Sequence, residues 1–407
     1  MTTGAAGTIN YPMEGLVVIN LTQIYNGPYA TYLMALAGAT IIKVEPPGGE
    51  PLRRRAVVGG AGLPFAMLNG CKQSIMLDLK SAEGKEALKA LAAEADVLVE
   101  NFAPGAMDRL GLGSATLQAA NPKLIYASSS GYGRDGPYAN YPAMDLTIQA
   151  MSGAIQITGF PDQPPVKAGP AIADFFAGIH LYGAIATALY ERERTGVARR
   201  LEVSMQDAIY ASMSSNFGMH WFTGGKAELT RTGNRHGGLA ECPYNVYPTT
   251  DGHIALICVG DLHWQALCRV MGRDDLAQHE RYQTLKLRVS HMDEVDEIIG
   301  AWSAGFDTET IFALLMSAKI PCAPVRGLEE VMEDRNMHAR GTLARIQHPE
   351  YGEIVVQRSP MRYEGVEDVP LEPSHGLGAD TQAVLRSRTS LDEAVLDAIA
   401  RAAAPKA

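Results

Sequence analysis

The 407-residue sequence has few cysteines, no long uninterrupted apolar run and no leader-like N-terminus. Its cysteines are odd in number, scattered and without CxxC spacing, which argues against a disulfide framework and indicates reduced core thiols. No apolar run reaches the length needed to span a bilayer, and residues 1–7 lack the charged and apolar segments of a signal peptide. We therefore expect a soluble, cytosolic protein. The cysteines are Cys71, Cys242, Cys258, Cys268 and Cys322.

Common cofactor signatures are also missing. The turn after the first predicted strand contains Asn26-Gly27-Pro28 instead of GxGxxG, so a nicotinamide or flavin cofactor is not expected. No GxxxxGK[ST] motif and no HExxH-like histidine spacing occurs, which leaves a P-loop and a metal site without support. The net charge of -10 argues against general nucleic-acid binding but allows local basic pockets for phosphorylated ligands. The chemistry is expected to use side chains alone, without a metal or a permanently bound cofactor.

What is present indicates a globular α/β protein. Hydrophobic residues make up 46% and charged residues 20% of the chain, and its length favours two domains. Strand-like and helix-like segments alternate through the first two hundred residues, which predicts a Rossmann-like parallel sheet with helices on both faces. Strands are expected at residues 16–21, 40–44, 74–79, 96–100, 123–128 and 200–205, and helices at 29–37, 81–95 and 174–189.

The character of the chain changes near residue 220, where glycine and turn-forming residues dominate up to residue 248. We expect a large α/β domain at residues 1–220, a linker and a smaller α+β domain at 221–325, and a return linker and the C-terminal part of the large domain at 326–407. In the smaller domain the pattern predicts a strand at 252–259 and helices at 262–271, 293–304 and 308–318.

Asp174 is the most informative single residue, because it is a lone carboxylate among small and apolar neighbours at the start of a long helix. The helix N-terminus favours the ionised carboxylate, whereas apolar surroundings raise its pKa. The position of Asp174 at the start of the helix is compatible both with an ordinary N-cap and with a carboxylate nucleophile. The apolar stripe predicted to face the core consists of Phe175, Ile179, Tyr182, Ile185, Ala186 and Leu189.

Several motifs in a shared order resemble the class III CoA-transferases, a family that also includes 2-methylacyl-CoA racemases. The resemblance spans nearly the whole chain. The matching segments are Asn26-Gly27-Pro28-Tyr29-Ala30, residues 38–45, 72–78 and 96–105, Gly131-Tyr132-Gly133-Arg134-Asp135-Gly136-Pro137, Ala173-Asp174, Met205-Gln206-Asp207-Ala208, residues 320–325 and residues 374–381.

The resemblance implies that Asp174 is the nucleophile. In the family this aspartate attacks an acyl-CoA thioester to give a mixed anhydride, and the released CoA thiolate then forms an aspartyl-CoA thioester, which is the general logic of covalent catalysis. Gly237 and Gly238 stand near the position of a family glycine loop over the active site. Backbone N–H groups of such a loop supply an oxyanion partner. A plain interdomain turn is the alternative for these two glycines.

Coenzyme A or acyl-CoA is expected as a substrate, and its phosphates need cations and its pantetheine a narrow neutral channel. The residues that match family contacts or the turn at the thioester end are Tyr25, Asn26, Asn101, Phe102 and Arg109. Lys72 and one or more of Arg53-Arg54-Arg55 are further candidates for contacts with the phosphates. For the triplet a solvated loop is the alternative. Pro46 and Ser130 depart from basic CoA contacts of some relatives.

Two other functions are weighed against CoA transfer. The racemases place His-Asp where this chain has Met144-Asp145, and a thioether cannot carry protons, so a two-base racemase is disfavoured. Asp145 is expected to be structural. A non-catalytic CoA-binding protein is the third hypothesis.

The resemblance also implies an interlocked homodimer. From the net charge and the apolar pattern, neither a nucleic-acid nor a membrane partner is expected. The acceptor is expected to be a small carboxylic acid, a dicarboxylate such as succinate being favoured. Its distal carboxylate is a hypothetical ligand of Arg134, Arg235 or His236.

Overall fold

The computed structural model describes residues 10–55, 62–226 and 231–403. The chain forms two compact units. The first comprises Met1–Gln149, Pro170–Ile209 and Asp334–Ala407, and the second Ala150–Gly169 and Tyr210–Glu333. The sequence placed its boundaries at residues 220 and 325, whereas the observed division also assigns Ala150–Gly169 to the second unit. The two units are described separately below.

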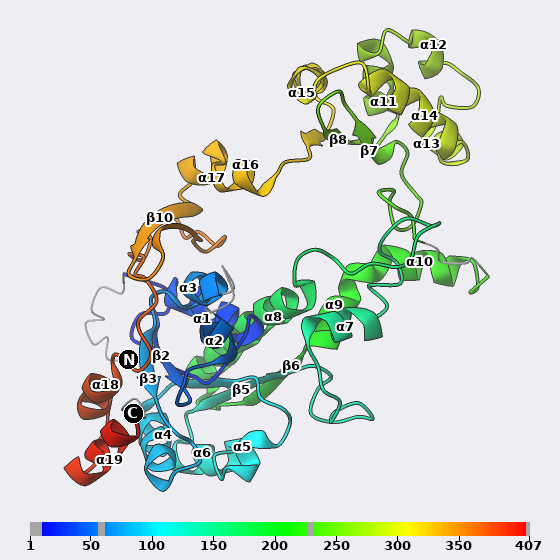
Figure 1. Cartoon of the computed structure of the whole chain (residues 1–407). Helices are drawn as coiled ribbons and strands as arrows, with labels where there is room; N and C mark the ends of the chain where they lie inside the picture. Colours follow the sequence, from blue (N-terminus) through cyan, green and yellow to red (C-terminus); the bar gives the residue numbers. More distant parts are fainter. Residues whose placement is uncertain (1–9, 56–61, 227–230, 404–407) are drawn as a thin grey trace. The chain divides into compact units, whose positions relative to one another are not determined.

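The first unit is built on a six-stranded sheet in the order β3-β2-β1-β4-β5-β6. Every neighbouring pair is parallel, which confirms the predicted parallel sheet, and the order is that of a doubly wound Rossmann fold. Figure 1 labels most of its elements. They are β1 Val17–Asn20, α1 Asn26–Ala35, β2 Thr40–Glu45, α2 Pro51–Arg54, α3 Leu63–Asn69, β3 Gln73–Met76, α4 Ala82–Glu94, β4 Val97–Glu100, α5 Ala106–Arg109, α6 Ser114–Ala120, β5 Ile125–Ser130, α7 Asp145–Met151, α8 Ile172–Thr195, β6 Arg200–Ser204, α9 Met205–Tyr210, α17 Arg335–Ala339, β10 Leu343–His348, β11 Gly352–Gln357, α18 Thr381–Arg388 and α19 Glu393–Ala403.

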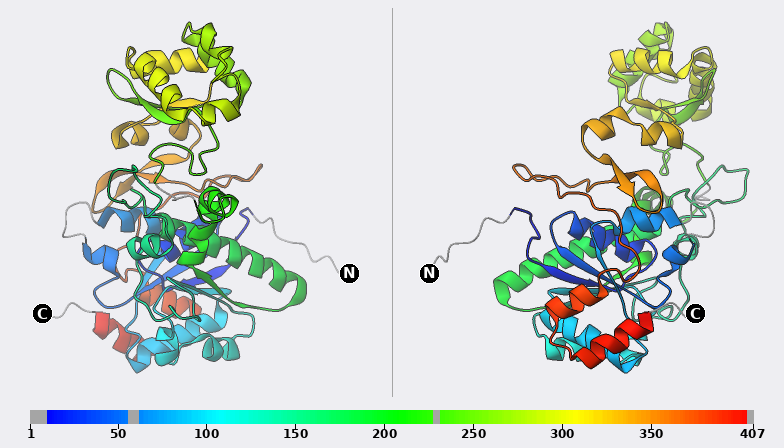
Figure 2. Two further views of the ribbon diagram at one scale, coloured as in Figure 1. Left: turned by 90° about the vertical axis from the view of Figure 1, so that its right-hand side faces the viewer. Right: turned by 60° about the vertical axis from the view of Figure 1, so that its left-hand side comes forward.

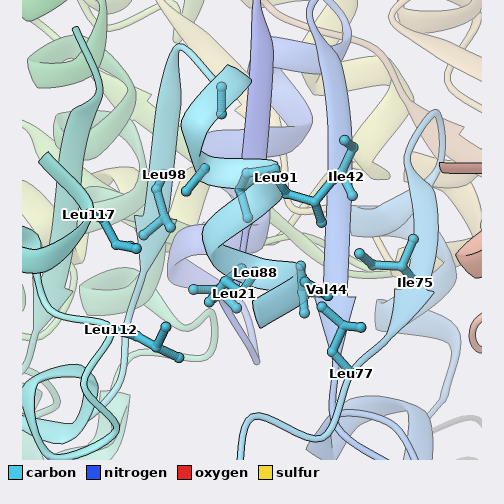
Figure 3. Packing of buried hydrophobic residues seen from close by; sticks show 14 of the residues in the cluster. Leu21, Ile42, Val44, Ile75, Leu77, Leu88, Leu91, Leu98, Leu112 and Leu117 are labelled. Atoms are coloured by element: carbon cyan, nitrogen blue, oxygen red, sulfur yellow. The ribbon is translucent and has the colours of Figure 1, made fainter. Parts of the chain in front are cut away.

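Helices cover both faces of this sheet because successive strand residues point to opposite sides. Ile19 and Leu98 belong to a cluster with α4, α6, α18 and α19, part of which is shown in Figure 3. Their neighbours Val18 and Val97 pack with α1 and α8 on the other face. The strands are therefore apolar on both sides, as expected of a covered parallel sheet.

The long helix α8 differs in two respects from its prediction. An 18-residue window with a mean hydropathy of 1.5 makes it long and apolar enough to cross a membrane by length and composition, so the expectation of no such run was wrong. In the structure its buried face lies among α1 and the sheet. Ile179, predicted to face the core, is 49% exposed, because Ala177 and Gly178 take the buried side at this end of the helix.

The C-terminal segment returns to the first unit and closes the edge of its sheet. The backbone N–H of Asp380 donates to the carbonyl of Ser74, and the carboxylate of Asp380 accepts from the N–H of Ser74 at 2.7 Å. Beyond this point α18 and α19 lie beside α4, as the two views of Figure 2 show. The residues 374–381 that matched a family segment thus pair with edge strand β3.

The second unit has its own antiparallel sheet in the order β7-β8-β9 and its own apolar core around Trp264, Ile299 and Leu315. Its strand β8 and helices α11, α14 and α15 confirm the predicted segments within a few residues. The elements are a 3-10 turn at Ala211–Met213, α10 Ser214–Phe222, β7 Tyr244–Pro248, β8 His253–Ile257, α11 Asp261–Val270, α12 Asp274–Ala277, α13 Leu285–Val289, α14 Met292–Ser303, α15 Thr308–Ser317, β9 Cys322–Pro324 and α16 Leu328–Met332.

Candidate active site

A cavity of about 670 Å³ opens at the carboxyl ends of the central strands of the first unit. Segments that follow β1, β4 and β5 line it, together with Asp174 from α8. In doubly wound sheets this is the edge where ligands bind, because the chain leaves adjacent strands in opposite directions at the point where the strand order reverses. Here that reversal lies between β1 and β4.

Asp174 is the carboxylate of this cavity. It is only 7% exposed and lies in the first turn of α8, whose N-cap is Ala171, so the interpretation of Asp174 as the N-cap is wrong. Among the described residues no side-chain donor is hydrogen-bonded to it. Burial, and secondarily the charge of Asp145, raises the pKa of Asp174 to about 7.

Asp145 supplies the capping interaction that Ala171 cannot make. One of its oxygens, Oδ1, accepts from the N–H of Ala173 at 2.9 Å and lies 3.4 Å from the N of Asp174. Its other oxygen accepts from the side chain of Gln149 at 2.7 Å. A carboxylate at this place is favoured by the helix dipole. The expected structural role of Asp145 therefore has a clear form, namely holding the turn that carries Asp174.

The turn after β1 brings Asn26 to the cavity. The Nδ2 of Asn26 donates to the Oγ of Ser129 on β5 at 2.8 Å, whereas its Oδ1 is buried and has no hydrogen-bond partner within the described part of the chain. A buried acceptor without a partner is costly. Asn26 itself is among the residues that line the cavity.

Asn101, Phe102 and Arg109 also line the cavity. The side chain of Asn101 pairs with the backbone of Gln23, accepting its N–H at 2.9 Å and donating to its carbonyl at 2.8 Å. Arg109 is exposed, and its guanidinium donates to the carbonyl of Pro104 at 3.5 Å. Its guanidinium is therefore accessible to a ligand anion, and Asn101 serves to shape the cavity wall.

Tyr25 is placed differently from the other predicted CoA contacts described above. It is not among the residues that line the cavity. Its ring stacks on Phe175 with 6.0 Å between centroids, next in sequence to Asp174.

Lys72 does not have the geometry of a phosphate ligand, so this prediction needs correction. It is 2% exposed, and its ammonium donates to the carbonyl of Pro28, the hydroxyl of Thr31 and the side chain of Asn69 at 2.9–3.0 Å. All three donors are occupied by protein acceptors. Burial lowers the pKa of Lys72 well below its usual value, so the residue is a buried structural link.

Arg53 of the arginine triplet is also occupied. It binds the carboxylate of Glu45 through two nitrogens, at 3.1 and 2.8 Å, and its guanidinium lies over the ring of Phe65. Arg54 and Arg55 are exposed, as the solvated-loop alternative expected.

Three further candidates, Gly237, Gly238 and Arg235, belong to the second unit and not to the unit that contains the cavity. The N–H of Gly238 donates to Nδ1 of His236 at 3.2 Å. Arg235 of the same segment is bound to Asp293 and Asp296, each at 2.7 Å. Its guanidinium is thus already neutralised by two carboxylates, which disfavours the hypothesis that it binds a substrate acid.

Arg134, in the first unit, lies 3.9 Å from the carboxylates of both Asp108 and Glu202. It lines a smaller pocket together with Glu100, Phe102 and Ser130. Three of these four residues follow or end strands β4 and β5, so the pocket lies at the same edge of the sheet as the cavity.

Two acidic residues near the site were missed by the sequence analysis. Glu100 ends β4, accepts the N–H of Phe102 at 2.8 Å, and burial raises its pKa to about 7. Glu50 follows β2 and accepts the N–H of Ile24 at 3.0 Å. Both follow or end parallel strands at the carboxyl edge, and that position is the signal that could have pointed to them.

Comparison with known proteins agrees with this architecture. The profile described as CoA-transferase family III matches residues 13–381. Acetyl-CoA:oxalate CoA-transferase from Acetobacter aceti is 36% identical over 94% of this chain and 97% of its own. Succinate–glutarate CoA-transferase from Agrobacterium fabrum is 34% identical, covering 97% and 98%. A crystal structure of a CAIB/BAIF family protein from Brucella suis superposes with a TM-score of 0.81 at 31% identity, covering 93% of this chain and 100% of that one.

The fold, the site and these similarities define a CoA-transferase of the α/β class, an enzyme that uses CoA thioesters as substrates. Within that class the chain belongs to CoA-transferase family III, as the resemblance of its motifs predicted.

Proposed function

We propose that this enzyme moves CoA from an acyl-CoA donor to a carboxylic acid acceptor through covalent intermediates on Asp174. The observation that carries the proposal is a carboxylate that is 7% exposed, lines a cavity of about 670 Å³ and has a pKa raised to about 7. A carboxylate shielded from water is a better nucleophile than a solvated one. Near pH 7 a substantial fraction of it is nevertheless ionised.

The proposed sequence conserves the thioester energy. An oxygen of Asp174 attacks the donor carbonyl, and the CoA thiolate leaves, giving a mixed anhydride. The thiolate then attacks the aspartyl carbonyl and releases the donor acid, which leaves an aspartyl-CoA thioester. The acceptor carboxylate displaces CoA to form a second anhydride, and CoA attacks its acyl carbon to release the new thioester and free Asp174. The low exposure of Asp174 limits hydrolysis of these intermediates.

Coenzyme A is proposed to lie along the residues that line the cavity. Arg109 offers an accessible cation for a phosphate, and Asn26, which lines the cavity, is the proposed contact for the pantetheine arm. Phe102 contributes an apolar wall. The family resemblance suggests Gly237 and Gly238 as the donors to the oxyanion.

For the acceptor we propose a small carboxylic acid, and a dicarboxylate above all. Similar proteins are named for oxalate, for succinate and glutarate, and for succinyl-CoA and mesaconate, and all of these are dicarboxylates or their thioesters. A homodimer in the cytosol completes the proposal. Support for dimerisation comes from helix α10, in which no residue is buried.

The racemase alternative is weakened by the cavity itself. Met144 lines the cavity with Asp174 and is 51% exposed, so the position that would need a proton carrier holds a thioether. The adjacent Asp145 is engaged with the α8 N-terminus and Gln149. Neither arrangement provides a second base of histidine type.

Intact-protein mass spectrometry after mixing with succinyl-CoA tests the proposal. The wild type should gain a CoA-sized adduct that one acid of a carboxylate panel discharges, whereas Asp174→Ala should gain none. Turnover of Asp174→Asn should fall at least about 10⁴-fold, as for other covalent nucleophiles. No adduct from any acyl-CoA donor, together with deuterium exchange at the alpha carbon of a 2-methylacyl-CoA, would instead establish the racemase.

A further inference from the structure

The turn after β1 contains a strained residue. Ile24 has a φ of 66°, in the left-handed region that disfavours L-amino acids and above all β-branched ones. Ile24 lines the cavity that Asp174 also lines. Backbone strain persists only where surrounding contacts hold it, and it gathers at functional sites. The contacts that hold Ile24 therefore bear on the shape of the active site.

Neighbouring residues of this turn are fixed by side chains from two other strands. The carbonyl of Thr22 accepts from the ammonium of Lys43 on β2 at 2.9 Å. Gln23 is paired through both its backbone groups with the side chain of Asn101, which follows β4. These contacts hold the chain just before Ile24 but do not fix Ile24 itself.

Glu50 holds Ile24 directly. Its Oε2 accepts the N–H of Ile24 at 3.0 Å, and the carboxylate lies 3.7 Å from the ammonium of Lys43. Glu50 is only 2% exposed, and its Oε1 has no hydrogen bond within the described residues. Burying a carboxylate costs desolvation free energy, which one hydrogen bond and one ionic neighbour offset only in part. Its specific contact is the strained amide.

We propose that Glu50 is a positioning residue of the active site, which keeps Ile24 in its left-handed conformation and thereby sets the turn that presents Asn26 to the acyl-CoA. This inference rests on the proposed function for the identity of the ligand. Without Glu50 the backbone of Ile24 can relax to negative φ. That change would move the cavity wall relative to Asp174 without removing any group that touches the reacting atoms.

Rescue by glycine is the decisive test, because glycine adopts positive φ without strain. Glu50→Ala should lower kcat/KM for succinyl-CoA by about 10- to 100-fold, the scale of small misplacements in an active site. Adding Ile24→Gly should recover most of this loss, whereas adding Ile24→Ala, which removes the side chain but keeps the strain, should not. Lys319→Gly relieves a similar φ of 57° in the second unit and should not rescue.

Hydrogen–deuterium exchange of the peptide that contains Ile24 gives a readout independent of activity. Its amide should lose protection in Glu50→Ala. If that variant does not fold, Glu50→Met, which keeps much of the side-chain volume but removes the acceptor of the Ile24 N–H, gives the same comparison, and its effect should shrink in the Ile24→Gly background. Equal effects of Glu50 variants with Ile24→Gly and with Ile24→Ala would overturn the positioning role. A wild type that forms no adduct would instead refute the proposed function, while the exchange comparison would still decide the role of Glu50.

Discussion

At the scale of single residues, the site depends on where charge is buried. Asp174 and Glu50 are both almost inaccessible, yet they are held in different ways. Burial of Asp174, and secondarily the nearby carboxylate of Asp145, raises its pKa to about 7, and no cationic partner is found among its described contacts. Glu50 has Lys43 beside it and a backbone donor. The first arrangement suits a nucleophile that must change its bonding, and the second suits a fixed support.

The pH dependence of the reaction should follow Asp174. Its ionised form is the nucleophile, so the rate should rise with pH through about 7 and level off above it. Asp145→Asn keeps an acceptor oxygen for the α8 N-terminus but removes the negative charge that raises the pKa of Asp174. The acidic limb of the pH–rate profile, where the rate rises with pH, should then move to lower pH by up to about one unit. Adduct formation measured against pH checks this shift.

Glu100 provides the control for this profile, because burial raises its pKa into the same range. Glu100→Gln should leave the acidic limb in place if Asp174 alone governs it. A limb that moves with Glu100→Gln and stays fixed with Asp145→Asn would contradict the assignment of the profile to Asp174.

At the scale of elements, the contact of α1 with α8 determines where Asn26 and Asp174 lie. Gly178 makes the close approach possible, since a Cβ there would lie 2.7 Å from the carbonyl oxygen of Asn26. Tyr29 on α1 also meets Phe175 on α8 edge to face, with 5.0 Å between centroids. The two helices thus fix a binding residue against the candidate nucleophile.

Replacement of Gly178 should disturb this contact. Gly178→Ala should lower the free energy of unfolding by about 1–3 kcal/mol, the usual cost of overpacking, and should reduce adduct formation as well. Gly183→Ala is the matched control in the same helix, where a Cβ meets nothing within 4 Å. That control should be neutral or stabilise the protein by about 1 kcal/mol. Thermal and urea unfolding of both variants measures the two changes in stability. Equal losses in Gly178→Ala and Gly183→Ala would contradict the importance of this contact.

At the scale of the whole molecule, the chain leaves its first unit twice and returns to it. Each unit has a separate apolar core. Helix α10 of the second unit has no buried residue, and its Trp221 and Phe222 are 79% and 90% exposed. In the proposed homodimer, these apolar side chains are the ones that a second copy of the chain would cover. A second copy of the chain is the partner that the proposed function includes.

The assembly state should therefore be dimeric. Sedimentation equilibrium should give twice the chain mass of 43.7 kDa, and replacing both Trp221 and Phe222 with serine should shift the equilibrium toward monomer. Leu262→Ser is the control, because Leu262 is 79% exposed on a helix whose other face is buried in the core. A monomeric wild type at micromolar concentration would rule out this assembly.

The sequence by itself determined the strands and most helices of the sheet, because their apolar periodicity is a local property. It also singled out Asp174, through a carboxylate set in an apolar segment and the order of the surrounding motifs. Asn101, Phe102 and Arg109 were likewise found from such motifs and do line the cavity.

Only the tertiary structure decided the roles that depend on contacts across the sheet. The sequence suggested that the Lys72 ammonium is available to bind a phosphate. In the structure it donates to three acceptors on α1 and α3. The apolar periodicity predicted that Ile179 faces the core. In the structure the small residue Gly178 lets α1 approach α8 closely, and Ile179 lies on the exposed face. Glu50 and Ile24 are 26 residues apart, and no local pattern reveals a hydrogen bond between them. Periodicity records which face is apolar, whereas packing decides which polar groups meet.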